Sequence, residues 1–101
     1  MDATFALLSD PGRRHILDLL RTGERSVNEL CAALPISQPG VSKHLRLMRE
    51  AGLVSARVDA QRRLYRLEPG PMQDLDAWLA PFREFWTARL DALERHLDHE
   101  S

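Results

Sequence analysis

The stretch SVNELCAALPISQPGVSKHLRLMREAGLV, residues 26–54, predicts two helices joined by a tight turn. Ser26, followed three residues later by Glu29, forms a capping-box pattern, which indicates the start of a short helix. A proline ends that helix, and Ser37 is placed to cap a second one. The second helix is expected from about residue 38 to 51, before a glycine that can close it in the left-handed conformation.

The second helix has two different faces. Val41, Leu45 and Met48 recur at spacings of four and three, so they share an apolar face that packs inward. The exposed side near the N-terminus is small and polar, which suits a helix laid in the major groove of DNA. Gly40 has no side chain, so we expect the start of this helix to approach a DNA backbone closely. Glycine also costs stability within a helix, so Gly40→Ala is expected to stabilise the fold.

A β-hairpin is expected directly after this helix. Residues 53–59 alternate between two sides with the period of a strand, and residues 63–68 do the same after a short turn. The tip carries Arg62 and Arg63, which would reach flanking phosphates or the minor groove. The predicted fold class is therefore mainly α with a β-hairpin wing, a winged helix-turn-helix.

Helices are also expected at both ends of the chain. Residues 2–8 form one candidate, and another begins after Ser9 or Asp10. A long helix is expected over about residues 72–97, kinked at Pro81, because its apolar seam keeps phase across the proline. The seam consists of Leu75, Leu79, Phe82, Trp86, Leu90, Leu93 and Leu97. Such a long stripe predicts a second partner surface, most simply the same helix of another subunit.

Composition narrows the class of protein. The chain has 101 residues and a formal net charge of −1, and this length favours a single domain over residues 1–101. Its one cysteine cannot form a disulfide within the chain, which favours a reducing, cytoplasmic location. No signal-peptide pattern or membrane-spanning run is visible. Positive charge is concentrated locally, since residues 37–66 hold seven basic and two acidic side chains. A polyanion responds to such local charge, so double-stranded DNA is the expected partner.

Three motifs in this order resemble one known family. LSDPGRRHILDLL, ELCAALPISQPGVSKHLRLMREAGLV and RRLYRL are similar to the corresponding segments of ArsR/SmtB-family bacterial winged helix-turn-helix repressors. The resemblance covers roughly residues 5 to 97. It implies a homodimer, formed by the first and last helices, that binds a palindromic operator and regulates transcription.

The resemblance also assigns roles to single residues. The residues that match the base-reading positions are Gln38, Ser42 and Lys43. Glutamine can pair with adenine and lysine with guanine, while serine can bond to several base donors or acceptors. The expected phosphate contacts, which add affinity and salt dependence, are Ser37, Arg46, Arg62 and Arg63. For His44 two roles stay open, a phosphate contact or packing at the edge of the helix, and packing is the favoured one.

The candidate metal ligands are few. Cys31 lacks the second cysteine of one family site and is expected to pack as a small apolar residue. His96 and His99 match half of another family site, but Arg83 and Phe85 stand where the other half should be and cannot ligate a divalent cation. No metal or other cofactor is therefore expected. An aromatic cluster on the last helix fits core or dimer packing, or an effector pocket of unknown ligand.

Three further functional classes compete with a DNA-binding repressor. The first is a metal- or small-molecule-responsive sensor whose ligand releases it from DNA. The second is a winged helix used only for protein contacts, which the clustering of basic residues on helix and wing disfavours. The third is an enzyme, which the sequence argues against because it contains no catalytic spacing and no glycine-rich phosphate loop.

Overall fold

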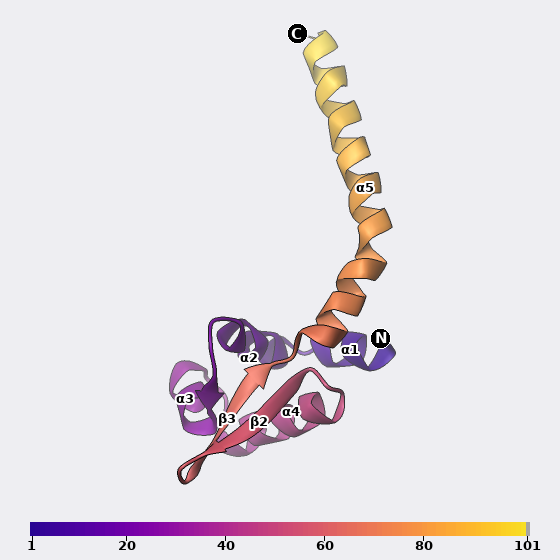
Figure 1. Ribbon diagram of the computed structural model, residues 1–101. Coiled ribbons are helices and arrows are strands. Elements are labelled where there is room, and N and C mark those ends of the chain that lie inside the picture. The colour runs from indigo at the N-terminus through magenta and orange to yellow at the C-terminus, as the bar shows by residue number, and fades with distance from the viewer. Residues whose placement is uncertain (101) are drawn as a thin grey trace.

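The computed structural model describes residues 1–100, with side chains described through residue 99. Two helices come first, a two-residue strand and the helix-turn-helix follow, and a hairpin leads into one long helix (Figure 1). The elements in chain order are α1 (Asp2–Leu8), α2 (Pro11–Arg21), β1 (Arg25–Ser26), α3 (Val27–Ala33), α4 (Gln38–Glu50), β2 (Val54–Asp59), β3 (Arg62–Leu67) and α5 (Pro69–Glu100). The predicted fold class is confirmed.

Local capping sets where the first helices begin. The Asp10 carboxylate accepts the backbone N–H groups of Gly12 (2.8 Å) and Arg13 (3.2 Å), so Asp10 rather than Ser9 caps α2. At α3 the predicted capping box is present, since the Glu29 N–H donates to Ser26 Oγ and the Ser26 N–H donates to the Glu29 carboxylate. Side chains close in sequence therefore decide these boundaries.

One apolar cluster joins α2, α3, α4 and the base of the hairpin. Its buried members are Ile16, Leu17, Leu20, Leu30, Val41, Leu45, Met48, Leu53 and Val54. The predicted inner face of α4 lies at the centre of this cluster, with all three of its residues fully buried. Burial of this face fixes the rotation of α4 about its axis and so determines which residues face outward.

The sheet has three strands rather than the expected two. The order is β1-β3-β2, antiparallel throughout, with Ser26 opposite Leu64 and Asp59 opposite Arg62. β1 is only two residues long and has no periodic pattern, so the sequence does not reveal it. Its pairing ties the base of the wing to the start of α3. The hairpin tip is a two-residue turn in which Ala60 has a positive φ of 57°.

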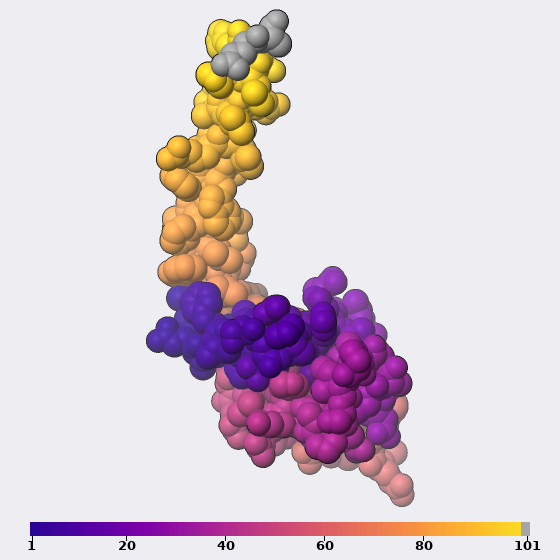
Figure 2. Space-filling view, turned by 180° about the vertical axis from the view of Figure 1, so that it is seen from behind, coloured from indigo at the N-terminus to yellow at the C-terminus, as the bar shows by residue number. Residues whose placement is uncertain are grey.

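The last helix is continuous through Pro81 and bends along its length (Figure 1). It starts at Pro69 instead of the expected residue 72, because prolines are tolerated in a first turn where their missing N–H is not needed. Phe5 of α1 packs edge-on against Trp78, with ring centroids 5.5 Å apart. Beyond that contact α5 projects from the body, uncovered in both views, and the molecule extends 64 Å (Figures 1 and 2). Within the described residues, no helix is long and apolar enough to cross a membrane.

Candidate nucleic-acid interface

The N-terminus of α4 is built from small residues. Ser37 Oγ accepts the Gly40 N–H at 3.2 Å, and Pro39 occupies the first turn. A Cβ added at Gly40 would lie 3.0 Å from Ile36 Cγ2 and 3.2 Å from Ser37 Oγ. These contacts are tighter than most Cβ contacts, so the Ile36 side chain would have to shift by a few tenths of an ångström to admit alanine. The stabilisation expected from the higher helix propensity in Gly40→Ala stays a prediction, and this shift of Ile36 acts against it.

The outer face of α4 presents the predicted reading residues together. Burial of the opposite face turns Gln38, Ser42, Lys43 and Arg46 outward, and all four are exposed. The N-cap residue Ser37 is exposed beside them. Because i, i+4 and i+8 positions lie along one side of a helix, three of these residues form a continuous polar row.

His44 lies against α2 rather than on the outer face. Its Nδ1 is 3.4 Å from Nη1 of Arg13, and the ring is half-buried. Arg13 Nε also donates to the Leu7 carbonyl at 2.7 Å, so this arginine contacts both α1 and α4. The neighbouring Asp10 has a lowered pKa, chiefly because its carboxylate accepts the Arg13 N–H. The predicted packing role of His44 agrees with this geometry.

An open cavity of about 410 Å³ separates the start of α4 from the wing. Gln38 lines it on one side, and Arg62 and Arg63 line it on the other. The structure therefore brings together predicted residues that lie 24 or more positions apart in sequence. Ser42, Lys43 and Arg46 lie outside this cavity, farther along α4. The remaining lining residues are Ser26, Val27, Asn28, Glu29 and Gln61.

Asn28 and Gln61 are additions that the sequence does not single out. Asn28 is an exposed residue of the first turn of α3, and Gln61 belongs to the hairpin turn. Neither residue stands in a periodic pattern or carries charge. Only the folding of the wing against α3 places them beside Gln38.

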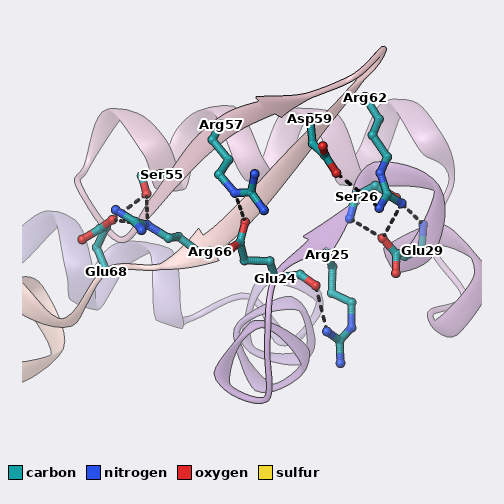
Figure 3. Close-up of polar contacts among 10 residues, drawn as sticks. All are labelled: Glu24, Arg25, Ser26, Glu29, Ser55, Arg57, Asp59, Arg62, Arg66 and Glu68. Atoms are coloured by element: carbon teal, nitrogen blue, oxygen red, sulfur yellow. Dashed lines mark hydrogen bonds and ion pairs between the residues drawn. The ribbon is translucent and has the colours of Figure 1, made fainter.

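The basic side chains of residues 37–66 differ in whether a carboxylate lies beside them. Arg57 pairs with Glu24 at 2.8 Å, Arg66 with Glu68 at 3.1 Å, and Arg62 with both Glu29 and Asp59 (Figure 3). Within the described part of the chain, the other basic residues of this region have no carboxylate within 4 Å; these are Lys43, Arg46, Arg49 and Arg63. Uncompensated positive charge is thus concentrated on the outer face of α4 and at one arginine of the wing.

Hydrogen bonding keeps the acidic partners ionised. The N–H of Ser26 and then its hydroxyl lower the pKa of Glu29, with a smaller contribution from the Arg62 charge. The Ser55 hydroxyl and then Arg66 lower the pKa of Glu68. Both carboxylates are therefore charged at neutral pH and compete with any external anion for the arginines beside them.

The candidate metal ligands do not gather in one protomer. Cys31 is partly buried and packs against the core, in agreement with its interpretation as a small apolar residue. His96 and His99 lie in the last turns of α5, where His99 lines a shallow pocket with Arg95 and Asp98. Among the residues that the structure describes, no group of three or more His, Cys, Asp or Glu side chains is positioned to hold a metal ion.

Comparisons with known proteins bear on this interface. A family model described as "Bacterial regulatory protein, arsR family" matches residues 10–56, from the cap of α2 into the first strand of the hairpin. The HTH-type transcriptional regulator Rv2034 of Mycobacterium tuberculosis is 36% identical over 98% of this chain and 90% of its own length. The arsenical resistance operon repressor of Escherichia coli is 37% identical over 96% of this chain and 84% of its own.

A solved structure gives a likeness in three dimensions. It is the solution structure of a homodimeric winged helix-turn-helix DNA-binding domain from Mycobacterium bovis, with a TM-score of 0.66 and 29% sequence identity. The match covers 82% of this chain and 77% of that one. It therefore extends beyond the helix-turn-helix into the flanking elements.

Proposed function

The chain belongs to the ArsR family of bacterial regulatory proteins, and we propose that it is a homodimeric transcriptional repressor that reads a palindromic operator. The observation that carries the proposal is the outer face of α4, which combines exposed polar side chains with uncompensated positive charge beside an arginine-tipped wing. Binding of DNA, rather than catalysis, is the proposed activity. An operator-binding role places the protein in the bacterial cytoplasm with the chromosome.

The proposed contacts divide by chemistry. Gln38, Ser42 and Lys43 read base edges in the major groove, because they lie at the exposed N-terminal end of α4 where such contacts are made. Ser37 and Arg46 contact phosphates on either side of these bases. The wing, which carries Arg62 and Arg63 at its tip, lies against the flanking backbone, where its positive charge faces phosphate. The cavity between Gln38 and the wing is where the DNA strand passes from one element to the other.

A homodimer supplies the second half-site. Large apolar side chains along α5 are exposed in the single protomer, namely Trp78, Phe82, Phe85, Trp86, Leu90, Leu93 and Leu97. Phe5 of α1 continues this surface through its contact with Trp78. Two copies joined through α1 and α5 would bury it and place two α4 helices on one face, as a two-fold operator requires. Residues 1–101 thus act as one DNA-binding domain with terminal dimerisation helices.

The test is a fluorescence-anisotropy titration with the promoter upstream of the protein's own gene and a scrambled duplex of equal length. Gln38→Ala combined with Lys43→Ala should reduce the ratio of specific to non-specific affinity by about tenfold or more, because each lost base contact removes ~1–3 kcal/mol of discrimination. Arg95→Ala serves as a control, since it removes a basic residue near the far end of α5. An unchanged ratio in the double variant would show that α4 does not read bases.

A further inference from the structure

The two arginines at the wing tip are in different electrostatic environments. Nη1 of Arg62 lies 3.5 Å from Oε1 of Glu29, and its Nη2 lies 3.7 Å from Oδ2 of Asp59. Arg63, the next residue, has no carboxylate within 4 Å among the residues that the structure describes. Figure 3 shows Arg62 reaching from the hairpin tip towards α3, between the two acidic side chains.

Glu29 is itself fixed in place. Its Oε1 accepts the Ser26 N–H at 3.0 Å, and its own N–H donates to Ser26 Oγ at 3.2 Å. Ser26 also pairs with Leu64 across β1 and β3, two residues along the strand from Arg62. The capping box of α3 therefore holds the carboxylate that faces the wing. A backbone pairing at the base and an ion pair near the tip both attach the wing to α3.

The charges around Arg62 also matter for an approaching polyanion. Glu29 lines the same cavity as Gln38 and Arg63, where the proposed DNA strand would pass. An uncompensated carboxylate beside phosphate is repulsive, and such a group disfavours binding. The guanidinium of Arg62 lies within ion-pair distance of two carboxylates. Its positive charge is therefore compensated within the protein by Glu29 and Asp59.

We propose that Arg62 is a positioning residue, which neutralises Glu29 and Asp59 and holds the wing beside Gln38, whereas Arg63 is the phosphate-contacting charge of the wing. This inference rests on the proposed DNA binding. It assigns different roles to two adjacent arginines that the sequence treats alike. It also makes Glu29 part of the DNA-binding surface through Arg62, although a carboxylate would not bind phosphate itself.

The experiment measures affinity for the specific duplex across a range of salt concentrations. Arg63→Gln should reduce the slope of log affinity against log salt by about 0.9, the value for one lost phosphate contact. Arg62→Gln should change that slope much less than Arg63→Gln does, because it removes no phosphate contact, and should weaken binding about two- to fivefold, as expected when an exposed ion pair is lost. Adding Glu29→Gln to Arg62→Gln should restore part of the affinity, because the amide oxygen still accepts the Ser26 N–H while the repulsive charge of Glu29 is gone and only that of Asp59 remains.

Glu24→Gln is the matched control for that rescue. Glu24 is another acidic side chain that pairs with an arginine of the hairpin, but its partner is Arg57 rather than Arg62. If Glu24→Gln rescued Arg62→Gln as well as Glu29→Gln does, general charge rather than the Glu29–Arg62 pair would be responsible, and the inference would fail. It would also fail if Arg62→Gln reduced the salt slope as Arg63→Gln does.

A readout without DNA separates this inference from a general loss of folding. Titration of the Glu29 carboxyl by NMR should give a higher pKa in Arg62→Gln than in the parent protein, and a smaller change in Arg63→Gln. Equal changes in the two variants would contradict the pairing. If the parent protein showed no salt-dependent binding to its promoter, the proposed function would fall, and the inference with it. Binding by the parent without the Glu29-specific rescue would overturn the inference alone.

Discussion

The winged unit, residues 1–68, buries most of its apolar side chains within one protomer, whereas the outer part of α5 leaves its own exposed. Leu45 of α4 is 0% exposed within one protomer, whereas Trp86 and Leu90 of α5 are 50% and 65% exposed. The winged unit therefore has its own core, while the outer part of α5 has apolar residues at core-like spacing but no core. A regular apolar pattern thus identifies a buried surface without showing whether the same chain buries it.

The largest expected effect comes from the centre of the winged unit. Leu45→Ala should lower the free energy of unfolding by ~2–5 kcal/mol, because it opens a cavity among fully buried side chains. Urea unfolding followed by circular dichroism measures it. Leu90→Ala, a matched change on α5, should alter protomer stability by only about 0.5 kcal/mol at concentrations that separate the subunits. Equal losses in the two variants would abolish the contrast between the regions.

The next effect concerns association. Leu90→Asp should weaken the homodimer by about tenfold or more, since a charge in an apolar interface removes burial and leaves an unpaired carboxylate. Sedimentation velocity over a concentration series measures the change. Ala88→Asp is the control, because it places the same group on the opposite side of α5. A dimer that survives Leu90→Asp unaltered would place the subunit contact elsewhere.

A smaller effect is expected where the wing base meets α3. Ser26→Ala should reduce the free energy of unfolding by about 1 kcal/mol through loss of the N-cap hydrogen bond to Glu29. Hydrogen exchange should accelerate in α3 and remain unchanged in the outer half of α5, which sharpens the division between the two regions. Ser42→Ala, which removes a hydroxyl from the exposed face of α4, provides the comparison. A similar loss of stability there would argue against a capping effect.

The smallest effect lies at the wing tip. Ala60 adopts a φ of 57°, which costs a residue with a Cβ about 1 kcal/mol or more. Ala60→Gly should raise the melting temperature slightly, because relief of that strain exceeds the entropy that glycine loses on folding. Gln61→Gly, at a turn position without positive φ, should lower it. A lower melting temperature for Ala60→Gly would show that the turn is not strained.

The sequence alone predicted much of the winged unit. The capping residues Ser26, Glu29 and Ser37 bond to backbone groups within three positions of themselves, so short sequence patterns locate them. The inner face of α4 follows in the same way from apolar spacing. The outward placement of Gln38, Ser42, Lys43 and Arg46 is then a consequence of helical geometry. Their contacts with DNA remain a prediction.

The tertiary structure decided what depends on distant pairing. β1 exists because Arg25 and Ser26 lie beside β3, and two residues carry no periodic signal of their own. Arg62 and Arg63 are identical in sequence terms, yet only Arg62 meets Glu29, which lies 33 positions earlier. Local hydrogen bonds and periodicity are encoded within a few residues, so they can be predicted from the chain. Which charges compensate each other depends on how separate elements pack, and only the folded structure supplies that information.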